Sequence, residues 1–226
     1  MVARAARITR DGRHGLATVE GVSSQQAPAL KRRRSTAAIA VQVILLFVSS
    51  LYVVEMLDQL SGSRLQRVGG LEPRETDGVD GILFAPVLHG PWEHLLANTV
   101  PLLVFGFLLL LGGVRRWLVV TAVVWLVGGA GVWLTGGAGT VHIGASVLVF
   151  GWLSYLLLRG IFSGRPRQQA LGVLLLVVYG GVLWGVLPGQ PGVSWQGHLF
   201  GAIGGGLAAW WLGRTDRASG QYHRRR

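Results

Sequence analysis

The sequence contains no cysteine and has few charged residues for its length. Without a thiol the chain can form neither a disulfide nor a thiol nucleophile, so both are excluded. Only 14% of the 226 residues are charged, and the long hydrophobic runs contain no charge apart from Glu55 at the end of the first one. A soluble domain of this size would distribute its charges along amphipathic elements. The composition therefore predicts a polytopic membrane protein.

Six hydrophobic stretches are candidates for membrane spans, because about 20 apolar residues cross a bilayer core of roughly 30 Å. They are 37–56, 94–112, 117–135, 145–158, 170–187 and 197–213. The first run is long enough to span, so we expect no cleavable signal peptide. The sequence predicts an all-α membrane protein whose helical domain covers 36–213 and has an outer loop at 57–93.

The basic residues are distributed unevenly between the segments that connect these spans. If the N-terminus is cytoplasmic, the outer segments hold only Arg64, Arg67 and Arg74 of the 21 basic residues. This bias predicts that both termini face the cytoplasm, in a bacterial plasma membrane. We expect a disordered basic tail at 1–35 and a second basic tail at 214–226. Such tails beside a membrane contact anionic lipid, so the lipid bilayer is an expected partner and nucleic acid is not.

Two polar residues are predicted to lie at one depth in the membrane. The segment from Ser146 to the end of its span at Leu158 contains 13 residues, which is about 20 Å of helix. The segment from His198 to Leu212 contains 15 residues, or about 22 Å of helix. Both helices run from outside to inside, so both residues are expected below the outer surface of the membrane.

The second span brings two more polar residues to this layer. His94 and Asn98 are four residues apart, so they share one face of a helix. Ionisable groups inside a membrane are costly and usually mark a function. The alternative is that each polar side chain only hydrogen-bonds a neighbouring helix. A shared depth for all four residues favours a functional site.

This set of side chains suits acyl transfer. A serine hydroxyl becomes a good nucleophile when a base takes its proton, and histidine has a suitable pKa. Spans two to six contain no aspartate or glutamate, so Ser146 and His198 could form a dyad but no triad. The Asn98 amide, an N–H of His94 and backbone N–H groups near Ser146 could stabilise an oxyanion.

Glycines and one aromatic residue are placed to support the dyad. Gly201 and Gly205 follow His198 on the same helical face, where they would allow close approach of a second helix. Phe150 lies one turn below Ser146. Its ring could stack on His198, or it could simply pack in the core.

Two other kinds of site compete with this hypothesis. Four histidines could in principle bind zinc: His89, His94, His142 and His198. His89 and His94 are five residues apart and do not share a helical face, and the spans offer no carboxylate ligand, so we expect neither a metal nor another cofactor. A small transporter would carry polar groups across the whole membrane, whereas these stop in its outer part.

The ordered motifs resemble those of the rhomboid family of intramembrane serine proteases. They are H-x4-H-x3-N (His89, His94, Asn98), G-x-S (Gly144, Ser146) and H-x2-G-x3-G (His198, Gly201, Gly205), and the match covers about 36–213. The resemblance implies a six-transmembrane-helix bundle. It implies Ser146 as nucleophile, His198 as general base, and an oxyanion hole of His94, Asn98 and the Ser146 N–H. It also implies that His89 shapes the outer part of the site.

The family hydrolyses peptide bonds in or near transmembrane segments of other membrane proteins, without a metal or nucleotide. Those transmembrane proteins are therefore the expected substrates, and the sequence does not indicate an oligomeric state. One position departs from the pattern, because most active rhomboids have glycine after the serine and this chain has Val147. A β-branched side chain there could crowd the fourth and sixth spans. A weakly active or inactive protein that binds transmembrane helices, as a chaperone or adaptor, is the alternative.

Overall fold

The structure is a computed structural model that describes residues 35–190 and 192–224, and in this part of the chain it contains helices and no strand. The helices are α1 (Thr36–Leu60), α2 (Arg64–Gly69), α3 (Gly81–Phe84), η1 (Ala85–Val87), α4 (Trp92–Leu110), α5 (Val114–Thr135), α6 (Ser146–Ser163), α7 (Pro166–Tyr179), η2 (Gly180–Val186) and α8 (Trp195–Arg224). The all-α class is confirmed. The tail expected at 1–35 lies outside the described residues, apart from Ser35.

Local sequence signals explain where several helices begin and end. The side chain of Ser35 caps α1 by accepting a hydrogen bond from the Ala38 N–H at 3.2 Å. Gly113, with φ 101°, separates α4 from α5, and Gly164, with φ 68°, ends α6 in the left-handed conformation that glycine tolerates. Pro166 then occupies the first turn of α7. The chain therefore reverses in short turns at one end of the bundle, which we call the turn end.

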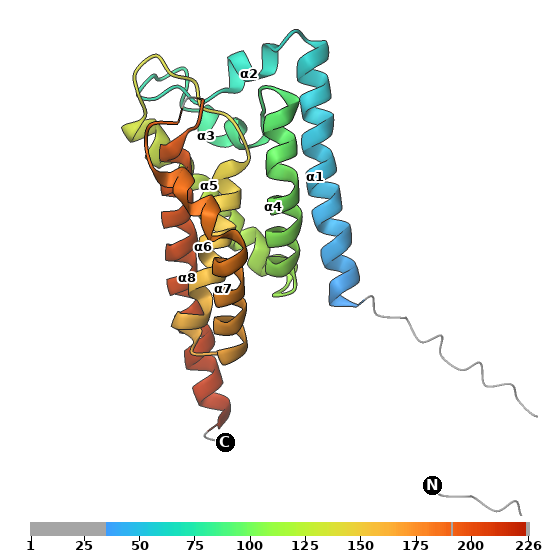
Figure 1. Ribbon diagram of the computed structural model, residues 1–226, viewed down its shortest axis with the longest axis vertical. Helices are drawn as coiled ribbons and strands as arrows, with labels where there is room; N and C mark the ends of the chain where they lie inside the picture. Colours follow the sequence, from blue (N-terminus) through green and yellow to red (C-terminus); the bar gives the residue numbers. More distant parts are fainter. Residues whose placement is uncertain (1–34, 191, 225–226) are drawn as a thin grey trace, which may run out of the picture. The chain divides into compact units, whose positions relative to one another are not determined.

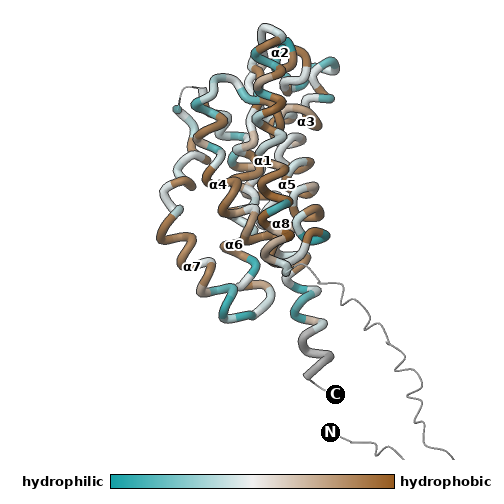
Figure 2. Tube along the Cα trace, turned by 90° about the vertical axis from the view of Figure 1, so that its right-hand side faces the viewer, coloured by the Kyte–Doolittle hydropathy of each residue, from teal (hydrophilic) through white to brown (hydrophobic). Residues whose placement is uncertain are grey.

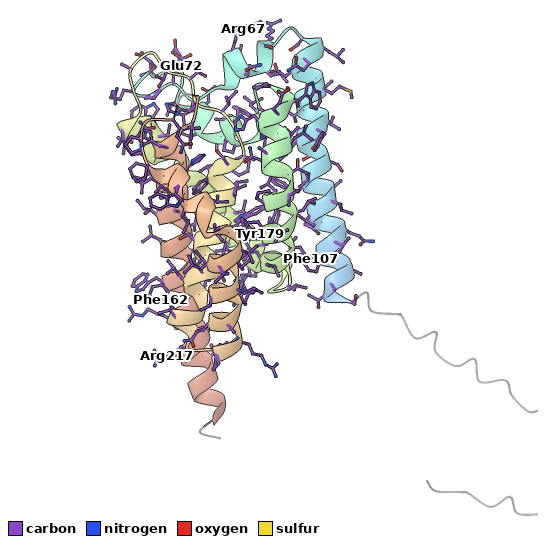
Figure 3. All side chains as sticks on the ribbon, in the orientation of Figure 1. Arg67, Glu72, Phe107, Phe162, Tyr179 and Arg217 are labelled. Atoms are coloured by element: carbon purple, nitrogen blue, oxygen red, sulfur yellow. The ribbon has the colours of Figure 1, made fainter. Side chains whose placement is uncertain are left out.

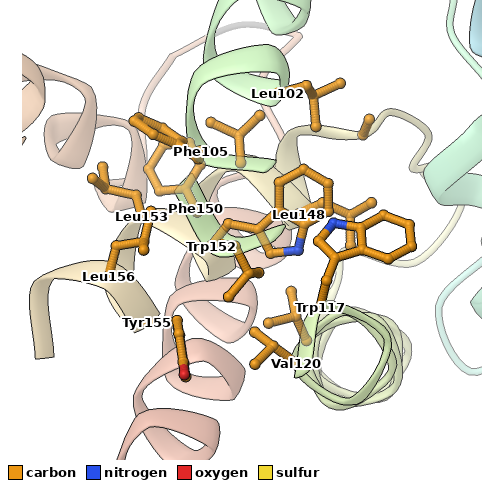
Figure 4. Packing of buried hydrophobic residues seen from close by; sticks show 14 of the residues in the cluster. Leu102, Phe105, Trp117, Val120, Leu148, Phe150, Trp152, Leu153, Tyr155 and Leu156 are labelled. Atoms are coloured by element: carbon orange, nitrogen blue, oxygen red, sulfur yellow. The ribbon is translucent and has the colours of Figure 1, made fainter. Parts of the chain in front are cut away.

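Helix α6 lies at the centre of the bundle, and α8 is its most extensive partner (Figure 1). Most of α6 is buried, and its Leu148, Trp152 and Tyr155 are inaccessible to solvent. Figure 4 shows these side chains packed with Phe105 of α4 and others of the main core cluster. The Trp152 indole N–H donates to Thr121 of α5 at 3.1 Å, which satisfies a polar group in this core.

Close backbone approach joins α6 to α8. A β-carbon on Gly205 would collide with the carbonyl oxygen of Gly151, and one on Gly201 would collide with that of Val147. The glycines of the G-x-x-x-G motif therefore lie against α6, as their position beneath His198 predicts.

The outer surface of the bundle is apolar. Five of the described helical segments are long and apolar enough to cross a membrane: α1, α4, α5, α6, and α7 continued by η2. Large hydrophobic side chains of α1 and α7, such as Leu46 and Val177, are exposed. Figure 2 shows hydrophobic residues along the helices and hydrophilic ones towards the ends. The protein is an integral membrane protein.

The helices differ from the predicted spans mainly at their ends. Helix α6 continues to Ser163, five residues past the predicted end, and α8 continues to Arg224. Most of the predicted basic tail from residue 214 is therefore a continuation of α8, because hydropathy reports where apolar sequence stops and polar residues can continue a helix. Helix α8 is also absent from the five spanning segments, since its apolar part is rich in glycine and its last turns are polar.

The predicted outer loop is largely structured. Helix α1 extends to Leu60, and α2, α3 and η1 follow before α4 begins. The apolar segment that starts at Gly81 forms α3 and η1 and packs against α5, where Trp125 donates to the Ile82 carbonyl at 2.9 Å. An antiparallel bridge joins Leu71 to His142 in the loop before α6. We call this end of the bundle the loop end.

Candidate active site

A cavity of about 640 Å³ opens near the loop end, and it is lined by polar residues that the sequence analysis identified as candidates. Its walls include His94 and Asn98 of α4, Ser146 and Phe150 of α6, and His198 of α8. Residues more than 100 positions apart in sequence therefore face one space.

Ser146 is the first residue of α6 and is half-buried in the cavity wall. Among the described residues, its hydroxyl has no hydrogen-bond partner, and its backbone N–H belongs to the first turn, where helical N–H groups have no carbonyl of their own helix to bind. Both groups are therefore available to a bound ligand. A nucleophile and an oxyanion donor need this availability.

His198 is held by two contacts that fix its ring. The ring of Phe150 stacks on it, with centroids 4.0 Å apart and an angle of 9° between the planes. Nδ1 donates a hydrogen bond to the Gly185 carbonyl oxygen at 2.8 Å, because a carbonyl can only accept. In the neutral ring this leaves Nε2 as the proton acceptor, which is the state a general base requires. No hydrogen bond joins His198 to Ser146 in the described structure.

His94 and Asn98 form the α4 side of the cavity. The Asn98 amide donates one N–H to the His94 carbonyl oxygen at 3.0 Å, so its second N–H remains for another acceptor. The His94 ring lies against the turn before Ser146, where Gly144 has φ 119°. A β-carbon on Gly144 would lie 2.5 Å from Cε1 of His94. The glycine of the G-x-S motif is thus required both by its backbone conformation and by its contact with His94.

His89 contacts the same turn before Ser146 through a hydrogen bond. It is almost completely buried, and its Nε2 accepts a hydrogen bond from the Ala145 N–H at 3.2 Å. Burial, and then the neighbouring His94, lower the pKa of His89 to about 4, so the ring is neutral at physiological pH. The two rings meet edge to face with centroids 5.3 Å apart. His89 therefore positions both the turn and His94.

Two loops meet beside the cavity through residues whose pairing the sequence did not indicate. His142 Nδ1 lies 2.6 Å from the Ser194 hydroxyl, and His142 Nε2 lies 2.9 Å from Thr140 Oγ1. Ser194 Oγ also accepts from the Gly197 N–H at 3.3 Å, as a cap of α8. The sequence indicates His142 only as a possible metal ligand, but among the described residues no three His, Asp or Glu side chains converge in a way that could hold a metal ion. Serine just before the start of α8 was a capping signal that could have been used.

The profile of the Rhomboid domain matches residues 77–215, which is more than half of the chain and includes every residue of this cavity named above. The chain belongs to the rhomboid family. It is also 50% identical over 182 residues to uncharacterised proteins of Mycobacterium tuberculosis and Mycobacterium bovis, a match that covers 77% of this chain and 75% of each relative. An uncharacterised protein of Mycobacterium leprae is 48% identical over the same length, which covers 77% of this chain and 72% of that protein.

In this rhomboid the valine after the serine is accommodated by glycines of two neighbouring helices. Val147 is buried, and β-carbons on Gly128 of α5 or Gly201 of α8 would collide with it. The crowding expected between α6 and α8 is therefore relieved, because both facing positions lack a side chain. The departure from the family pattern does not separate the helices that carry Ser146 and His198.

Proposed function

We propose that this rhomboid is an intramembrane serine endopeptidase that uses Ser146 and His198 as a dyad. The observation that carries the proposal is the state of His198, whose ring is fixed by Phe150 and Gly185 with Nε2 free, in the same cavity as an unengaged Ser146. The missing Ser146–His198 hydrogen bond does not oppose it, because catalytic hydrogen bonds are often long before substrate binds.

The proposed chemistry is an acyl transfer in two steps. His198 Nε2 takes the Ser146 proton as Oγ attacks the peptide carbonyl carbon, and the Ser146 N–H, Asn98 and His94 donate to the oxyanion. The protonated His198 then gives its proton to the leaving amine, so the C–N bond breaks and an acyl-enzyme remains. Water, deprotonated by His198, then attacks the acyl carbon. His198 returns that proton to Ser146 Oγ as the ester C–O bond breaks, which releases the acid and restores Ser146.

The substrates we propose are transmembrane segments of other proteins, because the family acts on membrane proteins within the bilayer. We further propose that α8 is the sixth membrane crossing and that both termini are cytoplasmic, as the arginine distribution favours. The mycobacterial relatives support a bacterial plasma membrane as the location. A helix-binding adaptor without catalysis is the second candidate, and the observation that favours it is the sequence departure at Val147, where most active rhomboids have glycine.

Labelling of the detergent-purified protein with a fluorophosphonate probe tests the nucleophile. Ser146→Ala and His198→Ala are each expected to abolish labelling, and to lower cleavage of a model single-span substrate by at least about a thousandfold. Ser194→Ala is the matched control, because Ser194 lines the same cavity and also contacts a histidine. Ser194→Ala should keep its label.

Labelling that persists in Ser146→Ala and disappears in Ser194→Ala would contradict the assignment of the nucleophile. A native protein that neither takes up the probe nor cleaves the substrate, but still binds it, would establish the adaptor function instead.

A further inference from the structure

At the turn end of the bundle, far from the Ser146 cavity, α6 and α8 line a second cavity of about 550 Å³ that is open to the surroundings. It is lined by Ile161, Phe162, Trp210, Arg214, Arg217 and Ala218. Figure 3 shows Phe162 and Arg217 at this end, with Arg67 and Glu72 at the opposite one. The lining combines hydrophobic side chains with two guanidinium groups.

The contact between α6 and α8 gives this cavity a defined floor. A β-carbon on Gly213 would lie 2.6 Å from the Cβ of Phe162, so the two helices touch there. Trp210, Arg214 and Arg217 are spaced by four and three residues, which places them on one face of α8. The Arg214 guanidinium lies over the Trp210 ring, 5.1 Å from its centroid. The cations and the apolar groups are therefore held side by side.

The two arginines have no carboxylate counter-ion among the described residues. Asp216 is the only carboxylate side chain between residue 94 and the end of the sequence. It is engaged by Arg116 of α5, with two N–O distances of 2.7 Å. Arg214 and Arg217 are both exposed and take no part in an ion pair in the part of the chain that the structure describes. Their charge is available to an anion from outside the chain.

We propose that this cavity binds one anionic phospholipid. The phosphate would lie between the Arg214 and Arg217 guanidinium groups, whose planar donors match phosphate oxygens. An acyl chain would run along the exposed side chains of Ile161 and Trp210, which are 60% and 47% accessible. Tryptophan favours the headgroup level of a membrane, and basic pockets between helices bind anionic headgroups there. An acidic protein segment would use the arginines but would gain little from this apolar wall, so lipid is the favoured occupant.

Native mass spectrometry of the full-length protein in detergent tests the proposal, with phosphatidylglycerol, phosphatidylcholine or inorganic phosphate added. The protein is expected to retain one phosphatidylglycerol in preference to phosphatidylcholine. Arg214→Gln/Arg217→Gln should weaken that binding about thirtyfold, from two headgroup contacts. Arg167→Gln is the control, because Arg167 is an exposed arginine at the same end that does not line the cavity. It should bind as the native chain does.

Unchanged binding in the double glutamine variant would overturn the site, as would equal retention of phosphatidylcholine. Competition by inorganic phosphate at equal concentration would show a simple anion site, and binding of an acidic peptide in place of lipid would show a protein site; either would overturn the lipid assignment. Arg214→Lys/Arg217→Lys keeps both charges but loses the planar donors, so its affinity should lie between those of the native chain and the double glutamine variant, which separates loss of the site from loss of the fold.

Discussion

The ring of Phe150 lies flat against the ring of His198, with centroids 4.0 Å apart and 9° between the planes. The same imidazole donates to the Gly185 carbonyl at 2.8 Å. One contact fixes the plane of the ring and the other fixes its rotation within that plane. Together they give His198 one orientation in the cavity before any substrate binds.

Replacing Phe150 with leucine is expected to lower kcat for the proposed cleavage by about three- to tenfold, which corresponds to one aromatic contact. Leucine keeps most of the buried volume, so the fold should survive. KM should change little, because Phe150 acts through the orientation of His198. Phe107→Leu is the control, since Phe107 lies on α4 away from the cavity lining. An equal fall in kcat for both variants would indicate a general packing effect.

Gly185→Ala is expected to disturb His198 from the other side. A β-carbon there would lie 2.8 Å from Cζ of Phe150 and 3.1 Å from Nδ1 of His198, so the stacked pair or the η2 backbone must shift. A small misplacement of a catalytic base is costly, and we expect kcat to fall at least about tenfold. Gly181→Ala, in the same 3-10 segment, meets no atom within 4 Å and should leave kcat unchanged. Full activity of Gly185→Ala would show that the Gly185 contact does not orient the base.

Some of this site could be predicted from the sequence because helical geometry is regular. A constant rise per residue put Ser146 and His198 at one depth, and helical spacing put Phe150 one turn below Ser146. Whether Phe150 stacked on His198 or packed elsewhere depended on how α6 and α8 meet, and spacing within one helix leaves that open. The structure supplies that relationship through Gly201 and Gly205.

Other parts could not be predicted, because they depend on irregular backbone. Gly185 contacts His198 only because the chain after α7 tightens into the 3-10 segment η2. The pairing of His142 with Ser194 joins two loops that lie 52 residues apart, and neither loop has a periodic pattern. The ends of the helices could not be predicted either. Apolar composition indicates which residues lie in the membrane, but it does not indicate where the last hydrogen-bonded turn of a helix ends.

The packing of the Val147 side chain against Gly128 can be tested without measuring catalysis. Gly128→Ala places a β-carbon into the Val147 side chain and meets no other atom closer than 3.6 Å. It should lower the free energy of unfolding by about 1–3 kcal/mol, as overpacking does. In a Val147→Ala background the same substitution should cost much less. The coupling between the two changes, measured by denaturation in detergent, should therefore exceed about 1 kcal/mol. Additive effects would show that the two side chains do not compete for one space.

The ion pair at the turn end predicts a pH-dependent stability. The Arg116 guanidinium lowers the pKa of the Asp216 carboxyl below its ordinary value of about 3.9. A depressed pKa means that the stabilisation is complete above the unfolded value and is lost as pH falls through the folded one. Asp216→Asn should therefore lower the free energy of unfolding by about 2 kcal/mol at pH 7. The difference from the native chain should begin to shrink below about pH 4, where Asp216 is protonated in the unfolded state, and it should vanish only below the lower folded pKa, where the carboxyl is protonated in both states. Tryptophan fluorescence during thermal unfolding at several pH values measures both the stability difference and its pH dependence.

Asp77→Asn is the control, because Asp77 is at an exposed position of the outer loop, and it should change neither the stability nor its pH dependence. A pH-independent deficit in Asp216→Asn would show that the carboxylate stabilises α8 by packing and not by its charge.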